Sequence, residues 1–408
     1  MQRVRPSAPQ LAGLAPYDPG HLPARACLNA NESAYALSAA ATCALAQAVC
    51  GRLLQRYPDP LARDLRARIA ALHGVGEERI LVGNGGDELL FDLALAYGGP
   101  GRTLLVAPPS FSSYETDARL TGTALCELPR VEAAASDDAT FGGGSSTRET
   151  HCVSSENGPT GPRRGGGVVS TPTAPDAGTL ATFAPDGPAL AGRVSQGDID
   201  LVMLASPNNP TGDALTERFV SDLLDASDAL VLIDQAYVEF ADARFDLVRL
   251  LDAHENLAIL RTFSKAYALA GARLGYLLAS ETVIGELCKV RQPYSVDAFS
   301  ALAGQAALDA QGEVDDAVSA TVGERARLSR ALALMPGVTV FASEANFVLF
   351  RVADAHRIWQ RLYDEHGILL RDFSSAPQLT DCLRVSVGTP QENDAFLDAL
   401  TGLTGGPA

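Results

Sequence analysis

The chain is organised around the run Leu260-Arg261-Thr262-Phe263-Ser264-Lys265-Ala266-Tyr267, with Lys265 near its centre. The apolar residues 257–260 predict a short buried strand that delivers this lysine. The hydroxyl side chains of Thr262 and Ser264 precede it and Arg273 follows it. These groups suit a phosphate dianion. The run therefore predicts an amine held beside a phosphate, where it could form a Schiff base with an aldehyde cofactor.

The bulk composition limits the class of protein. The 408 residues are 47% hydrophobic and 20% charged, which indicates a globular protein large enough for two domains. The net charge of −17 argues against nucleic acid and anionic membranes as partners. No apolar segment resembles a signal peptide or a transmembrane helix. The seven cysteines have no metal-binding spacing, so we expect reduced thiols in the cytoplasm and no metal site.

Short apolar strands alternate with helical segments from about residue 60. Strands are expected at 80–82, 103–106, 201–204, 229–233, 257–260 and 276–278. This alternation predicts an α/β fold with a mostly parallel sheet between helices. From residue 298 a long helical region precedes strands near 346–350, 367–370 and 382–387, which predicts a smaller α+β domain. We expect residues 1–45 to form an N-terminal arm and part of the small domain, 46–297 the large domain, and 298–408 the small C-terminal domain.

One segment breaks this pattern. Residues 132–196 are rich in Gly, Ser, Thr, Pro and Ala and include two glycine triplets, Gly142-Gly143-Gly144 and Gly165-Gly166-Gly167. A packed domain does not need so long a loop. We predict a disordered surface insertion without a chemical role.

Candidate binding residues follow several of the expected strands. Gly85, Gly86 and Asp87 open a helix after one strand, where backbone N–H groups favour an anion, although an ordinary turn capped by Asp87 fits equally well. Phe111 could stack on a planar ring or could be a core aromatic. Asn209 lies between prolines, which free its amide for a ligand oxygen.

Charged residues at other strand ends suggest anion and cation recognition. Asp234 ends an apolar strand, where a carboxylate needs a cation such as a protonated ring nitrogen. Tyr237 follows it and could bind a neighbouring phenolic oxygen. Arg371 and Arg384 lie on apolar strands and suit a phosphate or carboxylate, or else an internal salt bridge with Asp372.

In this order the motifs resemble the fold-type I aminotransferases, which use pyridoxal 5′-phosphate. Within that family the chain is most similar to the histidinol-phosphate aminotransferases. The matching stretches are Leu14-Ala15-Pro16-Tyr17, Leu28-Asn29-Ala30-Asn31-Glu32, Arg56-Tyr57-Pro58-Asp59-Pro60, the continuation of the lysine run to Gly271, and Leu383-Arg384-Val385. The resemblance covers nearly the whole chain except the insertion.

The resemblance implies a role for each residue. Lys265, Asp234 and Tyr237 would be catalytic, and Lys265 would move a proton on the substrate. Phe111 would stack on the cofactor ring, and Asn209 would bind it. The cofactor phosphate would be bound by Gly85, Gly86, Asp87, Thr262, Ser264 and Arg273, and by Tyr57 of the neighbouring subunit of a homodimer. Tyr17, Asn209, Arg371 and Arg384 would bind the substrates, histidinol phosphate and 2-oxoglutarate or glutamate.

The chain departs from the family pattern in a few places. Gln235 stands where the family usually has Glu, which puts only a contact behind the cofactor in doubt. Phe111 stands where the family often has Tyr, and Ser33-Ala34-Tyr35-Ala36 replaces Asn-Pro-aromatic-Gly.

Other functions remain open from the sequence. A relative with the same fold could act on aromatic amino acids or decarboxylate a phosphorylated amino acid. A non-catalytic regulator would lack the lysine or carry a DNA-binding domain, so the presence of Lys265 argues against it.

Overall fold

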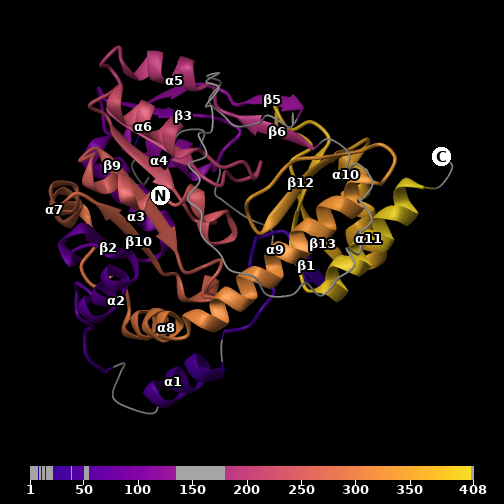
Figure 1. The fold of residues 1–408 in the computed structure, drawn as a ribbon, viewed down its shortest axis with the longest axis horizontal. Coiled ribbons are helices and arrows are strands. Elements are labelled where there is room, and N and C mark those ends of the chain that lie inside the picture. The colour runs from indigo at the N-terminus through magenta and orange to yellow at the C-terminus, as the bar shows by residue number, and fades with distance from the viewer. Residues whose placement is uncertain are drawn as a thin grey trace, which may run out of the picture.

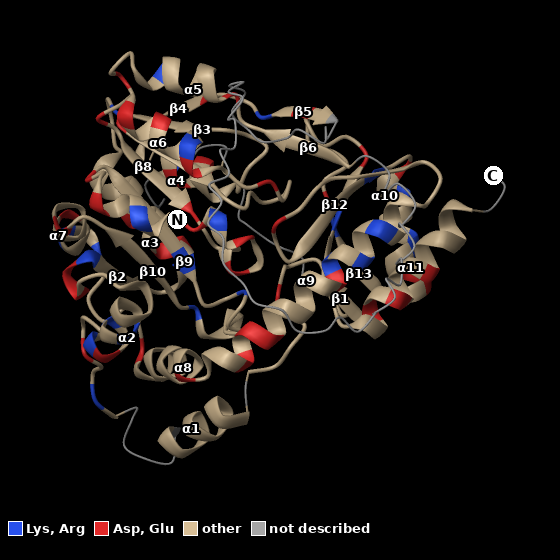
Figure 2. Cartoon of the chain, in the orientation of Figure 1, with Lys and Arg blue, Asp and Glu red and all other residues tan. Residues whose placement is uncertain are grey.

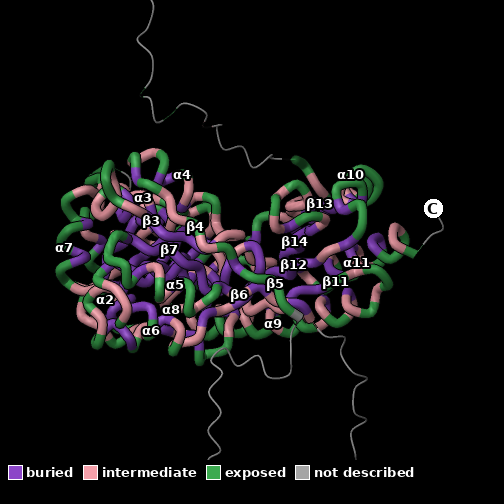
Figure 3. The backbone as a smooth tube through the Cα atoms, turned by 90° about the horizontal axis from the view of Figure 1, so that it is seen from above, coloured by how far each residue is buried: buried purple, intermediate pink, exposed green. Residues whose placement is uncertain are grey.

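The computed structural model describes residues 22–37, 39–49, 55–134 and 180–405, together with Ala8, Leu11 and Leu14. Within these residues the chain forms a larger and a smaller unit, each built on a β-sheet (Figure 1). Helix α9 (Gln311–Ala333) runs from the larger unit toward the smaller one (Figure 1). Buried residues gather along the strands at the centre of each unit (Figure 3).

The larger sheet has seven strands in the order β2-β10-β9-β8-β7-β3-β4. These are β2 (Ile80–Gly83), β3 (Thr103–Val106), β4 (Ala124–Glu127), β7 (Leu201–Ala205), β8 (Leu230–Asp234), β9 (Leu257–Thr262) and β10 (Gly275–Ala279). Neighbouring strands are parallel from β9 to β4, and β10 is antiparallel to both β9 and β2. The predicted mostly parallel sheet is confirmed, and β4, which the periodicity did not reveal, extends its edge.

Helices cover both faces of this sheet, as strands buried on both sides require. One face packs against α3 (Gly85–Tyr97), α4 (Ser113–Thr121) and α7 (Glu281–Val290). The other packs against α2 (Arg63–His73), α5 (Gly187–Val194), α6 (Glu217–Asp225) and α8 (Ala298–Asp309). Helix α8, assigned from the sequence to the small domain, packs on α2 and on α1 (Ala39–Val49). Short 3-10 helices span Glu77–Arg79, Val238–Phe240, Ala243–Phe245, Val248–Asp252 and Ala270–Ala272.

The smaller sheet has five strands in the order β1-β13-β14-β12-β11. These are β1 (Ala26–Leu28), β11 (Val338–Val340), β12 (Phe347–Val352), β13 (Ile368–Asp372) and β14 (Cys382–Ser386). Helix α9 packs on this sheet together with α10 (Ala355–His366) and α11 (Pro390–Thr404), where Leu328, Leu362 and Phe396 are fully buried. Strand β1 pairs in parallel with β13, so residues close to the N-terminus complete a sheet built from the C-terminal part of the chain.

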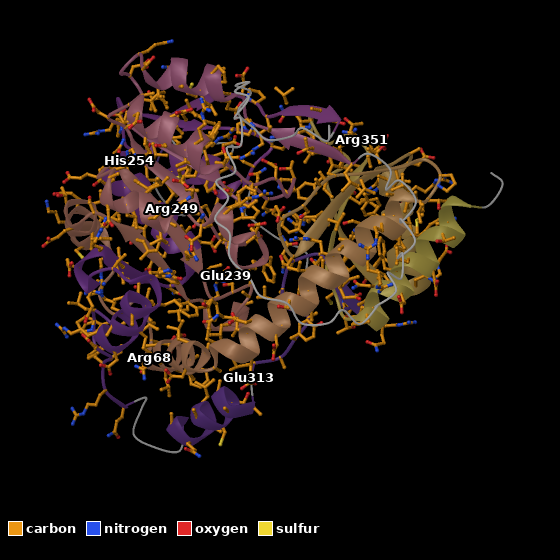
Figure 4. The ribbon with its side chains drawn as sticks, in the orientation of Figure 1. Arg68, Glu239, Arg249, His254, Glu313 and Arg351 are labelled. Atoms are coloured by element: carbon orange, nitrogen blue, oxygen red, sulfur yellow. The ribbon has the colours of Figure 1, made fainter. Side chains whose placement is uncertain are left out.

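The predicted insertion at 132–196 is too long at both ends. Residues 135–179 lie outside the described residues, but Val131–Ala134 forms β5 and pairs with β6 (Ala181–Ala184). Arg351 on β12 forms an ion pair with Glu132 on β5 at 2.7 Å, which ties this hairpin to the smaller sheet (Figure 4). Phe183 is 2% exposed, and α5 buries Leu190 and Val194 in the main core.

The cause of this error is local composition. Strand β6 is only Ala181-Thr182-Phe183-Ala184, and α5 begins with Gly187-Pro188, so both resemble a linker. Asp186 accepts a hydrogen bond from Ala189 N at the start of α5, with proline in the first turn. That Asp-Gly-Pro sequence is a helix start signal that could have revealed the helix.

Charged side chains of both signs are spread over the helices and loops of the two units (Figure 2). Arg325 on α9 donates to Phe240 O and Ala345 O at 3.0 and 2.9 Å, which links the two units. In the part of the chain that the structure describes, no helix is both long enough and apolar enough to cross a membrane.

Candidate active site

The candidate site lies where several strands end. Strands β2, β3, β7, β8 and β9 run in the same direction, so their carboxyl ends meet at one edge of the larger sheet. Open α/β sheets bind ligands at this edge. Phe111, Asn209 and Lys265 lie in the loops that follow these strands, Asp234 is the last residue of β8, and Gly86 lies in the first turn of α3.

A cavity of about 310 Å³ lies at this edge, and residues of the smaller unit line one side of it. Most of the residues predicted for the site line it, although they are far apart in the sequence. They are Gly86, Asp87, Phe111, Asn209, Asp234, Tyr237, Thr262, Ser264, Lys265, Arg273, Arg371 and Arg384. Among the described residues, Gly85 and Tyr57 do not line the cavity, and Tyr17 lies outside the described residues.

Lys265 reaches the cavity from the loop after β9. Its Nζ donates to Ala30 O at 3.0 Å and lies 5.8 Å from the centre of the Tyr237 ring. Burial lowers the pKa of Lys265 to about 8, and the positive charges of Arg384 and Arg273 act in the same direction. A substantial fraction of this amine is therefore neutral near pH 8 and able to act as a nucleophile.

Asp234 is a buried carboxylate at the end of β8. Its Oδ2 accepts from the Tyr114 hydroxyl at 2.8 Å, and its Oδ1 accepts from Ala236 N at 3.1 Å. Burial raises the pKa of Asp234 to about 6 despite these hydrogen bonds. A cation in the cavity would offset the cost of burying this charge, and a protonated ring nitrogen is such a cation.

The first turn of α3 forms one end of the cavity. Helix α3 begins at Gly85, whose φ of 79° suits glycine, and a Cβ there would lie 2.7 Å from Arg273 Nη2. Asp87 is therefore inside the helix rather than its cap, and it forms an ion pair with Arg273 at 2.8 Å. Thr262 and Ser264, which carry hydroxyl groups, line the same cavity. Free N–H groups at a helix start, with hydroxyl groups and a guanidinium beside them, can bind a phosphate.

Two arginines of the smaller sheet line the other side. Arg384 is 5% exposed; it donates to the side-chain oxygen of Asn209 and to Asn29 O, the latter at 2.7 Å. Arg371 has no carboxylate partner among the described residues, since Asp372 pairs with His356 at 2.7 Å. The Phe373 ring lies 5.9 Å from the Arg371 guanidinium and 5.5 Å from that of Arg384. This side of the cavity can therefore bind an anion, and Asp372, considered from the sequence as a salt-bridge partner, pairs with His356.

Gln235 occupies a buried position behind the site. It donates to Phe245 O at 2.8 Å and accepts from Arg261 Nη2 at 3.0 Å. Asp246 forms an ion pair with the same guanidinium at 2.7 Å. The amide at position 235 therefore lies beside an arginine that already has a negative partner.

Two residues that contact the predicted catalytic groups were missed. Tyr114 is fully buried against Asp234, and Asn31 donates to the Tyr237 hydroxyl at 3.0 Å. Tyr114 lies in the strand-end run that contains Phe111, and Asn31 lies in one of the stretches that carried the family resemblance. Nothing in their local sequence indicates which distant side chain each one contacts.

The fold and cavity are those of an aminotransferase. The family model for aminotransferases of class I and II matches residues 26–139 and 163–400, and the chain belongs to this family. It is 35% identical to a histidinol-phosphate aminotransferase 1 of Carboxydothermus hydrogenoformans, over 98% of this chain and 99% of that protein. It is 36% identical to a histidinol-phosphate aminotransferase of Stenotrophomonas maltophilia, over 98% and 95% of the two chains.

A solved structure supports the same fold. The crystal structure of histidinol-phosphate aminotransferase from Sinorhizobium meliloti in complex with pyridoxal-5′-phosphate superposes with a TM-score of 0.79 and covers 98% of both chains, at 24% identity. The fold-type I architecture predicted from the sequence is confirmed.

Proposed function

We propose that this chain uses pyridoxal 5′-phosphate to transfer the amino group of L-histidinol phosphate to 2-oxoglutarate in histidine biosynthesis. The products are imidazole acetol phosphate and L-glutamate. Relatives named histidinol-phosphate aminotransferase match nearly the full chain and support this substrate. The observation that carries the proposal is one cavity holding a lysine of lowered pKa, a buried carboxylate and two arginines.

The residues present fit the cofactor. The first turn of α3, with Gly85, Gly86, Asp87, Thr262, Ser264 and Arg273, would hold its phosphate. Asp234 would hold the proton on its ring nitrogen, Phe111 would stack on the ring, and Asn209 and Tyr237 would bind the ring oxygen. When bound, the cofactor supplies a conjugated ring that accepts the electrons released at the substrate carbon.

Lys265 performs the proton transfer in the proposed reaction. Its amine would hold the cofactor and, as a general base, would carry a proton away from the reacting carbon of the substrate. The positive charges of Arg384 and Arg273 favour the neutral amine that this role requires. Tyr237 and Asp234, each buried near Lys265, exclude water and hold the reacting groups in place.

Arg371 and Arg384 are proposed to bind the anionic ends of both substrates. Histidinol phosphate carries a phosphate and 2-oxoglutarate carries carboxylates, and a guanidinium can pair with either through two hydrogen bonds. Arg384, anchored by Asn29 and Asn209, would be the fixed group. Arg371 would adjust its position to the phosphate of one substrate or the carboxylate of the other. Tyr17 would close over the substrate.

We also propose a cytoplasmic homodimer in which Tyr57 reaches the phosphate in the partner's site. The Tyr57 ring is 83% exposed and stacks on Tyr294 at 4.8 Å, so a large aromatic surface is presented to solvent. Residues 46–309 would form the cofactor-binding domain, because α8 packs on its core, and 310–408 would form the small domain, with 1–45 as the arm and part of the small domain. Sedimentation equilibrium that finds only monomer at micromolar concentration would refute the dimer.

The function is tested by mixing purified protein and cofactor with L-histidinol phosphate and 2-oxoglutarate, and measuring glutamate. We expect glutamate to form in proportion to the histidinol phosphate consumed. Turnover of phenylalanine instead would indicate an aromatic amino-acid aminotransferase. Release of carbon dioxide from a phosphorylated amino acid would indicate a decarboxylase. No reaction with any amine, and no visible absorbance band with added cofactor, would refute the enzyme assignment.

The lowered pKa of Lys265 predicts how cofactor attachment depends on pH. Only the neutral amine attacks an aldehyde, so its reactive fraction rises as the pH rises through the pKa. We expect the rate of attachment to cofactor-free protein to increase with pH with a midpoint of about 8. Stopped-flow absorbance between pH 6 and 11 measures this rate, and a midpoint near 10.5 would contradict the proposed environment of Lys265.

A further inference from the structure

The segment from Asn29 to Asn31 contacts three different site residues. It follows β1 in the smaller unit and lines the cavity. Asn29 O accepts from Arg384 at 2.7 Å and Ala30 O accepts from Lys265 Nζ at 3.0 Å. Asn31 Nδ2 donates to the Tyr237 hydroxyl at 3.0 Å. Asn29 anchors Arg384, whereas Asn31 has no role in the function described so far.

Hydrogen bonds from the smaller unit fix Asn31 in one orientation. Its backbone N donates to Ser386 Oγ at 2.8 Å, and Ser386 Oγ donates to Asn31 Oδ1 at 3.1 Å. Asn346 Nδ2 donates to Asn31 O at 3.0 Å. The Asn31 side chain is 1% exposed, and its φ of 55° lies in the left-handed region that asparagine tolerates better than most residues.

The orientation of the Asn31 amide determines what the Tyr237 hydroxyl can do. Ser386 Oγ accepts from Asn31 N and donates its own proton to Oδ1, so Nδ2 is the amide atom that faces Tyr237. The phenol oxygen therefore accepts from Asn31, and its own proton remains available for a group in the cavity. The Tyr237 ring is held edge-on against Phe347, with 5.2 Å between ring centres, so the hydroxyl has little freedom to move away.

We infer that Asn31 is a positioning residue: it directs the Tyr237 hydroxyl proton into the cavity, toward the ring oxygen of the cofactor. The inference rests on the proposed function. It also explains how the smaller unit, through Ser386 and Asn346, can influence a hydroxyl group that belongs to the larger unit. Weakening the hydrogen bonds that Ser386 or Asn346 makes with Asn31 would allow the Asn31 amide to rotate. The Tyr237 hydroxyl proton would then no longer be directed into the cavity.

The substitution Asn31→Asp tests the inference with almost no change in shape. Aspartate keeps an oxygen for Ser386 but presents a second acceptor to Tyr237, so the phenol would donate to Asp rather than into the cavity. The ring oxygen of the bound cofactor would then lose a hydrogen-bond donor, which would raise the pH at which the cofactor-loaded protein loses a proton. We expect the pH midpoint of the visible absorbance of the cofactor-loaded protein to rise by about one unit, and kcat to fall roughly 10- to 100-fold.

A second variant separates hydrogen bonding from charge. Asn31→Gly suits the left-handed backbone and introduces no charge, but it also removes the donor to Tyr237. We expect a smaller rise of the absorbance midpoint in the same direction. A rise in the aspartate variant with a wild-type midpoint in the glycine variant would mean that charge alone acts, and would overturn the inference. If the aspartate variant does not fold, the glycine variant decides alone by the same criterion.

Asn256→Asp is the matched control. Its amide donates to Leu224 O, Ser227 O and Ala229 O at 3.3, 2.9 and 3.3 Å, in a loop that does not line the cavity. This variant should lose thermal stability while its absorbance midpoint and kcat stay at wild-type values. Wild-type protein that shows no visible band and no turnover would refute the proposed function. Wild-type protein that titrates with the same midpoint as both Asn31 variants would refute only the role of Asn31.

Discussion

Replacing Lys265 by alanine should abolish transamination and remove the visible absorbance band of the cofactor-loaded protein. The substitution removes both the amine that attaches the cofactor and the general base, so we expect kcat to fall by about 10⁴-fold or more. The fold should survive, because burial and two neighbouring arginines already disfavour the charged lysine. Absorbance spectra, steady-state assays and thermal unfolding of the same preparation measure the three effects.

Lys289→Ala is the control for this experiment. Lys289 lies on α7, is largely exposed, and pairs with Glu286 at 2.6 Å, an interaction of small energetic value. The visible absorbance band, the turnover and the unfolding midpoint of the Lys289→Ala variant should match those of the wild type. A Lys265→Ala protein that kept the band would show that a different amine holds the cofactor.

Replacing Asp234 by asparagine should reduce kcat by about 10²- to 10⁴-fold. Removing one partner of a buried ion pair typically costs about 3–5 kcal/mol, and each 1.36 kcal/mol corresponds to about tenfold in rate. The cofactor-free variant should nevertheless be at least as stable as the wild type, because burial raises the pKa of Asp234 and thus penalises its charge. Asparagine can still accept from Ala236 N and donate to the Tyr114 hydroxyl.

Asp213→Asn is a matched control with the opposite expected result. Asp213 is also a buried carboxylate, but it forms an ion pair with Arg130, which is itself fully buried. Asparagine there would leave the guanidinium charge uncompensated, and we expect a loss of about 3–5 kcal/mol in the free energy of unfolding. Denaturant unfolding of the cofactor-free proteins compares the two variants. Equal destabilisation of both would contradict the view that Asp234 is kept for the cofactor at the expense of stability.

Much of the fold could be predicted because its signals are local. The strands at 80–82, 103–106, 201–204 and 257–260 are short apolar runs between helices, and the structure has a strand at each. The hairpin strand β6 and helix α5 escaped prediction because their residues are small and their length is short. Their burial comes from contacts with distant strands, and local composition does not report such contacts.

Some residues of the candidate site could likewise be predicted from the sequence, and others could not. Asp234, Lys265 and the first turn of α3 could be proposed from the sequence, since each directly follows a predicted strand and parallel strands bring such positions to one edge. The sequence also left Arg371 and Arg384 open between an internal salt bridge and a free anion site. In the structure Asp372 pairs with His356, and both guanidinium groups lie beside the Phe373 ring and line the cavity, which supports the proposal of an anion site.

The sequence by itself determined the main alternation of strands and helices, the family and the chemical types of the groups at the strand ends. Only the tertiary structure decided which distant side chains meet: Tyr114 with Asp234 across 120 positions, and Asn31 with Ser386 across 355. The physical reason is that a strand or helix start depends on neighbouring residues, whereas a buried hydrogen bond between distant residues depends on how the two sheets and their helices pack.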